Sequence, residues 1–476
     1  MNTASNRDGV TNSLKKSLTL YDVFSISTGA MFSSGFFLLP GIAAAQTGTS
    51  VILAYFVAGL MILPAMFSKV ELTSAMPKAG GSYYFIERAM GPMMGTIGGL
   101  GTWLSLVFKT AFALIGMGFY LALLVDIPIK PLAIALTVAF MALNVVGAKE
   151  SSGLQRILVT VLLAVLGFFI AQGLYFVANS PEATQSLSES GPFFTNGVEG
   201  FMGTVGLVFV SYAGLTKVSS VAEEVENPDR TIPLGMLLSI GVATFVYCVG
   251  VAVMMWVIPR GEFVADTTPV ATAAKVLFDW MPWGLGVGLA VTAAVAAFAS
   301  TGNAGIMSAS RYPLAMGRDR LLPSAFTHIG RFSTPTMGIL ATGVFMIFSI
   351  VFFEISMVAK LGSAFQLVIF GLINLCVIVM RESHLKYYHP VFRSPLYPWL
   401  QIAGILIPIW LISEMGLVPS LMSIILIGFC IAWYNFYARG RVERYGAVHH
   451  VFERLGRVRS VSVDKELRTI LGEKGL

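Results

Sequence analysis

Long apolar runs alternate with short polar stretches along almost the whole chain. A helix needs about 20 apolar residues to cross a hydrocarbon core of about 30 Å, and counting such runs predicts about twelve membrane-spanning helices. We expect them over residues 20–44, 50–74, 93–124, 129–147, 156–178, 199–222, 232–258, 284–311, 335–354, 357–380, 397–415 and 418–438. The sequence therefore predicts an all-α, polytopic membrane protein.

Charge supports this division and gives the spans an orientation. With the N-terminus in the cytoplasm, 24 of the 31 Lys and Arg residues lie on the cytoplasmic side and four lie outside. This positive-inside bias favours cytoplasmic N- and C-termini. Residues 1–17 are polar and lack a short apolar core with a cleavage site, so we interpret them as an uncleaved tail.

Composition excludes several classes of protein. The chain is 56% hydrophobic and 12% charged, with a mean hydropathy of +0.78, which rules out a water-soluble enzyme and a disordered chain. The basic residues are scattered, so no nucleic-acid partner is indicated. No catalytic pair, phosphate loop or metal-ligand spacing is present, and we expect no enzyme activity, no cofactor and no metal.

The first span carries small and helix-weakening residues at mid-membrane depth, GAMFSSGFFLLPG over residues 29–41. We expect the helix to break there, because unpaired backbone in a membrane is tolerated only where it is buried or lines a polar cavity. The freed N–H groups of Ser33, Ser34 and Gly35 would suit a carboxylate. The alternative is tight packing of small residues against a neighbouring helix.

A second soft stretch, residues 211–216, lies five spans later. The two stretches hold corresponding places if the first ten spans form two five-helix halves. Repeats with an odd number of spans insert with opposite topology, and paired broken helices at matching positions indicate a transporter's binding site.

The residues then resemble a known family, the amino acid–polyamine–organocation superfamily of permeases, over nearly the whole length. Five stretches carry the resemblance. They are residues 29–41, ELTSAMPKAGGSY over 71–83, SYAGLTKVSSVAEEVENP over 211–228 with Arg230, NAGIMSASRYPLAMGRDRLLP over 303–323, and PVFRSPLYP over 390–398.

The resemblance implies a 5+5 inverted repeat plus two peripheral helices, the fold of the leucine transporter, and secondary active transport of amino acids or related amines. It places the substrate carboxylate on the N–H groups of Ser33, Ser34 and Gly35. The ammonium would meet carbonyls near Ala30, Val210, Ser211 and Gly214, and Met31, Tyr212 and Thr110 would complete the pocket.

Three positions depart from the family's pattern. Ser33 stands where the family usually has Gly, which narrows the pocket or adds a hydroxyl donor. Thr216 stands where an acidic residue often lies, so no fixed negative charge awaits a cationic side chain. Leu162 stands where proton-coupled members carry a Lys.

Lys109 lies near the middle of the third span, where exposure of a lysine to lipid costs at least about 2.5 kcal/mol. It should therefore face the bundle interior. Three roles remain open: a coupling charge that titrates in a dry site, an attraction for an acidic substrate side chain, and a structural pin on carbonyls or a carboxylate. Lys217 is expected to reach toward the cytoplasmic edge.

Charged groups at the cytoplasmic ends of the spans are candidates for a gate. We expect Glu71, Glu223 and Glu224 to pair with Lys78, Arg230, Arg311 or Arg318, although surface pairs of this kind are worth under about 1 kcal/mol. Ser300 and Thr301 could offer oxygens to Na⁺, as hard cations prefer, or could simply be small packing residues.

We therefore expect a multi-pass permease of the cell (inner) membrane that moves an amino acid or close analogue by alternating access. The coupling partner is a proton in preference to sodium, or a counter-substrate, and neutral or acidic substrates are favoured over cationic ones. The alternative is a ligand-sensing membrane protein, a transceptor of the same fold without significant flux.

The chain then divides into four parts: a tail over residues 1–17, a ten-helix transport core over 18–380, a loop and two further helices over 381–438, and a cytoplasmic tail over 439–476. The last part is either solvated or carries a short helix with an apolar stripe of Val442, Tyr445, Val448, Phe452 and Leu455.

Overall fold

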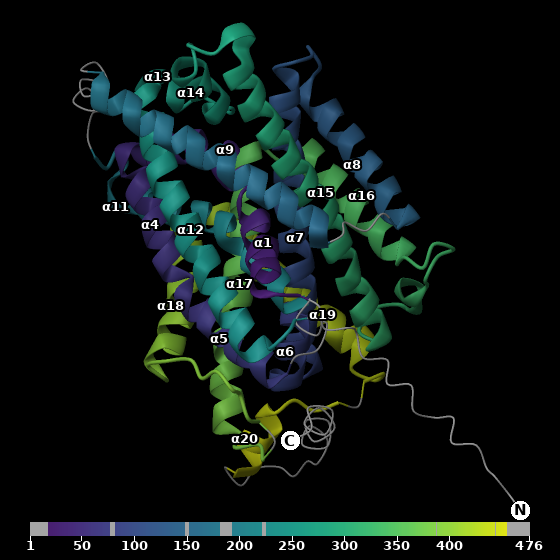
Figure 1. Cartoon of the computed structure of the whole chain (residues 1–476). Helices are drawn as coiled ribbons and strands as arrows, with labels where there is room; N and C mark the ends of the chain where they lie inside the picture. Colours follow the sequence, from purple (N-terminus) through teal and green to yellow (C-terminus); the bar gives the residue numbers. More distant parts are fainter. Residues whose placement is uncertain are drawn as a thin grey trace, which may run out of the picture.

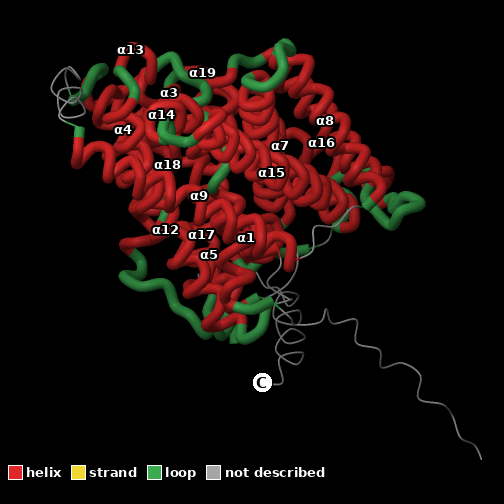
Figure 2. Tube along the Cα trace, turned by 45° about the horizontal axis from the view of Figure 1, so that its top comes forward, coloured by secondary structure: helices red, strands yellow, loops and turns green. Residues whose placement is uncertain are grey.

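The computed structural model describes residues 18–76, 81–147, 152–180, 193–220, 225–386, 388–442 and 444–454. These ranges are almost entirely helical (Figure 2) and contain no β-strand apart from an isolated bridge between Leu18 and Val225. Of the described residues, nine helical segments are long and apolar enough to cross a membrane, and two further apolar helices are shorter. The prediction of an all-α polytopic membrane protein is confirmed.

Each expected span corresponds to helix in the structure. The first is divided into α1 (Leu20–Met31), α2 (Ser34–Phe37) and α3 (Leu39–Thr47), and the second into α4 (Val51–Met61) and α5 (Leu63–Ala75). The sixth is α11 (Gly197–Val208) followed by the 3₁₀ helix η2 (Phe209–Ser220). The others are α7 (Pro92–Ala122), α8 (Ile129–Val146), α9 (Ser152–Asn179), α12 (Pro228–Val257), α15 (Leu285–Arg318), α16 (Thr336–Phe352), α17 (Ile355–Glu382), α18 (Trp399–Glu414) and α19 (Leu417–Trp433).

Four short helices lie outside the expected spans and mark the two ends of the bundle. α13 (Arg260–Phe263) and α14 (Pro269–Leu277) lie at the top of Figure 1, and α6 (Gly81–Met90) and α20 (Val448–Arg454) lie at the bottom. We call these the α14 end and the α6 end. The sequence did not predict α6, α13 and α14, because they are too short to give the long apolar run that identifies a span; α20 lies in the tail, for which a short helix was one of the two alternatives.

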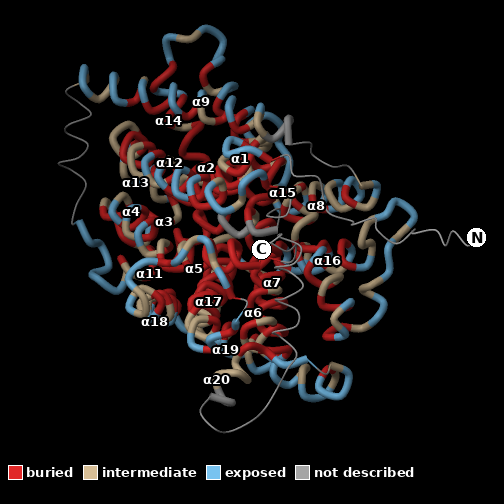
Figure 3. The backbone as a smooth tube through the Cα atoms, turned by 60° about the horizontal axis from the view of Figure 1, so that its bottom comes forward, coloured by how far each residue is buried: buried red, intermediate tan, exposed pale blue. Residues whose placement is uncertain are grey.

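α7 is the central helix of the bundle. It packs along α15 and α17, and 83% of its most apolar stretch is buried, against 17% for α8 and 22% for α19. Figure 3 shows the same division, with buried chain inside and exposed chain around it. Apolar residues that remain exposed on α8 and α19 suit contact with lipid, so these helices form the periphery.

The chain's C-terminal segment docks on the α6 end. The Ala447 N–H donates to the Arg88 carbonyl of α6 over 2.9 Å, and the Arg444 guanidinium donates to an Asp319 carboxylate oxygen over 2.8 Å. A Cβ at Gly446 would lie 2.3 Å from the Gly91 nitrogen, so only glycine fits this contact. A short helix, α20, is present over residues 448–454, but Val442 and Tyr445 precede it and Tyr445 is exposed, so they do not share a helical stripe with Val448. Leu455 and the Phe452 side chain lie outside the described part.

Candidate functional site

The first span is interrupted where its small residues predicted a break. α1 ends at Met31, Phe32 has ψ 85° and Ser33 has φ −148° and ψ −116°, and the helix resumes at Ser34. The Ser33 N–H donates to the Met31 carbonyl over 2.9 Å, so it is already engaged in this conformation. Ser34 and Gly35 begin the resumed helix, and the first N–H groups of a helix have no acceptor within it.

The second soft stretch forms a narrower helix instead of an irregular break. α11 gives way at Phe209 to the 3₁₀ helix η2, which contains Val210, Ser211, Tyr212 and Gly214. A 3₁₀ helix bonds each N–H one residue closer than an α-helix does, so its backbone stays largely paired. This differs from the open interruption expected from the sequence, because the small residues allow a narrower helix as well as a break.

The two altered stretches pack directly against each other. A Cβ at Gly35 would lie 2.5 Å from both the Cβ and the Oγ of Ser211, and a Cβ at Gly214 would lie 2.8 Å from the backbone of Ala30 and Met31. A real Cβ cannot approach other atoms this closely, so only glycine fits at positions 35 and 214. The structure therefore brings together five of the expected substrate-binding residues, with no room for a substrate between them.

Buried tyrosines satisfy the carbonyls at these stretches. The Tyr247 hydroxyl, from α12, donates to the Met31 carbonyl over 2.8 Å and lies 3.3 Å from the Ser211 carbonyl. Tyr55 donates to the Gly35 carbonyl over 2.7 Å, and Tyr212 donates to the Tyr55 carbonyl over 2.9 Å. Sequence reasoning missed Tyr55 and Tyr247. The available signal was a tyrosine inside an apolar run, since a buried phenol needs a partner.

Lys109 extends from α7 toward the end of α1. Its side chain is buried, and Nζ donates to the Ala30 carbonyl over 3.0 Å. A cation is stabilised at the C-terminal end of a helix, where the last carbonyls have no intrahelical donor. Thr110, the next residue, is turned toward α15, where a Cβ at Gly305 would lie 2.1 Å from its hydroxyl.

Two buried hydroxyls near the interrupted helices have no hydrogen-bond partner among the described residues. They are those of Ser33 and Thr301, whereas the Ser211 hydroxyl interacts with the phenols of Tyr55 and Tyr247. Ser300 and Thr301 are both buried in α15, and Ser34 and Val210 are buried beside Ser33 and Ser211. A partnerless buried hydroxyl is costly, which suits a site whose ligand completes its hydrogen bonds.

The acidic residue expected at a gate is held by an arginine that sequence reasoning missed. Glu71 accepts two bonds from Arg381 of α17, over 2.8 and 2.6 Å. The Tyr388 hydroxyl and the Ser394 N–H donate to the same carboxylate over 3.0 and 2.8 Å. Burial, with the Glu71 charge beside it, raises the pKa of the Tyr388 phenol well above its usual range, so the phenol stays protonated and donates.

The remaining gate candidates lie apart from this cluster. The side chains of Arg230, Arg311 and Arg318 are exposed, and none of them forms an ion pair with another described residue. Glu223, Glu224 and Lys78 lie outside the described ranges.

Comparison with known proteins gives a match over most of the chain. Residues 18–446 match the sequence pattern of the amino acid permease family. The chain belongs to this family. The permease is 27% identical to cationic amino acid transporter 3, mitochondrial, of Arabidopsis thaliana, over 82% of its own length and 65% of that protein's. It therefore spans just under two thirds of the length of this plant relative.

Two bacterial relatives match this chain over most of the length of both sequences. The permease is 27% identical to the branched-chain amino acid permease BcaP of Bacillus subtilis (strain 168), over 90% of its own length and 94% of the relative's. It is 26% identical to the methylthioribose transporter of the same organism, with the same coverage. These relatives are transporters, which agrees with the resemblance that the five sequence stretches carry.

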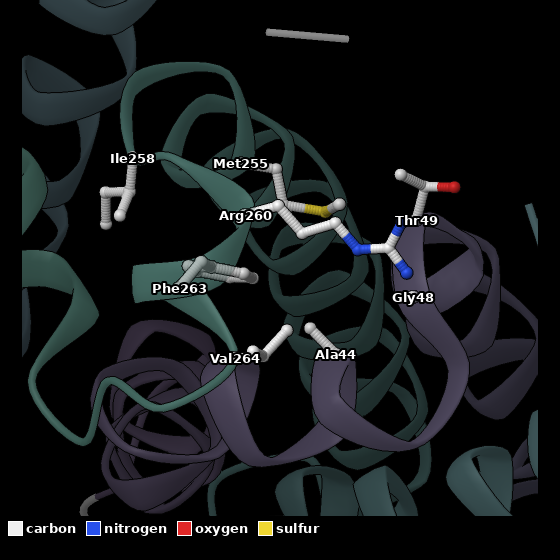
Figure 4. Close-up of a pocket in the computed structure, with 8 residues that line it drawn as sticks. All are labelled: Ala44, Gly48, Thr49, Met255, Ile258, Arg260, Phe263 and Val264. Atoms are coloured by element: carbon white, nitrogen blue, oxygen red, sulfur yellow. The ribbon is translucent and has the colours of Figure 1, made fainter. Parts of the chain in front are cut away.

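Two cavities of the permease lie at its α14 end. One, of about 530 Å³, is lined by residues of α3, α7, α8 and the α16–α17 connection, including Ile115, Lys130 and Glu354. The other lies between Ala44, Met255 and Arg260 (Figure 4) and holds about 10 Å³, room for a single water. Neither cavity is lined by the expected substrate-binding residues.

Proposed function

We propose that the permease is a secondary active transporter of amino acids or closely related amino compounds, working by alternating access. The contact between the interrupted first span and η2 carries this proposal, because main-chain groups at helix breaks are how such carriers grip a zwitterion. The names of the relatives, a branched-chain amino acid permease and cationic amino acid transporters, support the same substrate class.

In this proposal the substrate separates the two stretches that now touch. Its carboxylate binds the N–H groups of Ser34 and Gly35, together with that of Ser33 once the Ser33 bond to Met31 is released. Its ammonium binds carbonyls of Ala30, Val210, Ser211 and Gly214. Met31, Tyr212 and Thr110 shape the remainder of the pocket.

We propose that the α6 end faces the cytoplasm and that the cluster around Glu71 closes it. The cluster joins α5, α17 and the segment before α18, so these elements must part before a substrate can leave on that side. The cavity of about 530 Å³ at the α14 end would then be the external entrance. Ile115 on its wall is six residues from Lys109, about 9 Å along α7.

Uptake into liposomes tests the proposal. Purified protein with an imposed proton gradient, or with unlabelled amino acid inside, is expected to accumulate labelled neutral or acidic amino acids. Saturable binding of an amino acid without uptake would contradict the proposal and favour a ligand-sensing protein of the same fold. A Gly214→Val variant should lose uptake because its side chain meets the Ala30 backbone, whereas Gly241→Val, on the open surface of α12, should keep it.

A further inference from the structure

Lys109 donates to a backbone carbonyl that the amino group of a substrate is expected to bind. Its side chain is 5% exposed, and its ammonium donates to the Ala30 carbonyl over 3.0 Å. Ala30 lies one residue before the end of α1. The protein thus carries its own tethered cation at the place where the expected site binds a positive charge.

A second cation lies near this ammonium. Lys217 of η2 is near enough to repel it electrostatically. Among the described residues no carboxylate forms an ion pair with Lys109.

One carbonyl does not satisfy a buried ammonium. The group has three N–H donors, and a buried charge is stable only when it is paired and fully hydrogen-bonded. A structural pin would be expected to show a full set of acceptors. Within the described part of the chain Lys109 has only the Ala30 carbonyl as an acceptor, so its ammonium retains donors for a further group.

Nearby polar groups show the same imbalance. The Ser33 hydroxyl is buried and has no partner among the described residues. The Met31 carbonyl, in contrast, already accepts from Tyr247. The Ser33 hydroxyl can therefore donate to a ligand, while the neighbouring Met31 carbonyl is already used as an acceptor.

We propose that Lys109 determines specificity by pairing with an acidic group of the substrate, so that the permease carries acidic amino acids and rejects those with cationic side chains. This inference rests on the proposed function and narrows its substrate class. The side-chain carboxylate of the substrate pairs with Lys109, and the Ser33 hydroxyl supplies a further donor.

Ligand-dependent stabilisation against heat, measured with glutamate, leucine and arginine, tests the proposal. Wild-type protein should be stabilised by glutamate and not by arginine. In Lys109→Met, which removes the charge and keeps most of the volume, the apparent dissociation constant for glutamate should rise by about 30-fold or more. Lys275→Met, an exposed lysine of α14, gives the same change in net charge and should leave the ranking intact.

Two results would overturn the assignment: stabilisation of the wild type by arginine at least as strong as by glutamate, or an unchanged ranking in folded Lys109→Met. If that variant does not fold, competition for wild-type uptake decides, since glutamate should compete and arginine should not. Binding and uptake of leucine alone would refute the acidic substrate and leave the carrier standing, whereas no response to any amino compound would remove the proposed function itself.

Discussion

Removing the Arg381 side chain should destabilise the protein, because it leaves a buried carboxylate at the α6 end without its cation. Glu71 is fully buried, and Arg381 gives it two short hydrogen bonds while also donating to the Ser394 carbonyl over 3.0 Å. The guanidinium further stacks on the Tyr397 ring at 4.4 Å. An Arg381→Met variant keeps the aliphatic stem and loses all of these contacts.

The magnitude follows from the burial of the carboxylate. Breaking a buried ion pair by removing one partner costs about 3–5 kcal/mol, because the remaining charge is uncompensated. The Arg381 side chain is 19% exposed, and Glu71 keeps its hydrogen bonds from Tyr388 and Ser394. We therefore expect the free energy of unfolding to fall by about 3 kcal/mol, the lower end of this range. In a Glu71→Gln background the same arginine change should cost about 1 kcal/mol, as for a neutral hydrogen bond.

The assay is a double-mutant cycle on the free energy of unfolding, measured by denaturant titration in detergent micelles. Arg393→Met serves as the matched control, because Arg393 is exposed in the same segment and should change stability by no more than about 0.5 kcal/mol. Equal effects of Arg381→Met in the wild-type and Glu71→Gln backgrounds would refute the reasoning, since they would mean that the two side chains are not coupled.

Three further outcomes are expected. Tyr247→Phe should lower the free energy of unfolding by about 1–3 kcal/mol in thermal or denaturant unfolding, because it leaves buried carbonyls without their donor; a change near zero would contradict the bridging role. Gly35→Ala should abolish uptake, and a second change, Ser211→Gly, should restore part of it because it removes the two atoms that the new Cβ would meet at 2.5 Å. Uptake by Gly214→Ala should not be restored in this way, because its Cβ would meet the backbone of Ala30 and Met31. Replacing sodium by choline should leave the initial rate of uptake into proteoliposomes unchanged, and a loss of most of the uptake would favour the hydroxyls of Ser300 and Thr301 as a cation site.

The sequence predicted the helices and the position of the first break because both depend on local pattern. Apolar run length gives the spans, and the small residues between Gly29 and Gly35 give the interruption at Phe32 and Ser33. It did not distinguish an open break from the 3₁₀ helix η2, because glycine and serine permit both.

Contacts between distant parts of the chain could not be predicted from such patterns. Glu71 and Arg381 are 310 residues apart, and Tyr247 lies in an apolar run that gives no indication of which carbonyls its hydroxyl reaches. Lys109 was identified as anomalous from the sequence alone. Its acceptor, the Ala30 carbonyl, could not be predicted, because the pattern does not indicate which helix end the Lys109 side chain reaches.

The docking of the C-terminal segment on α6 has a practical consequence. Because the Ala447 N–H donates to the Arg88 carbonyl and Gly446 packs closely against Gly91, we expect residues 444–447 and α6 to move together. A spectroscopic label placed on an exposed position of this segment would therefore report rearrangements of α6 while leaving the transmembrane helices unmodified.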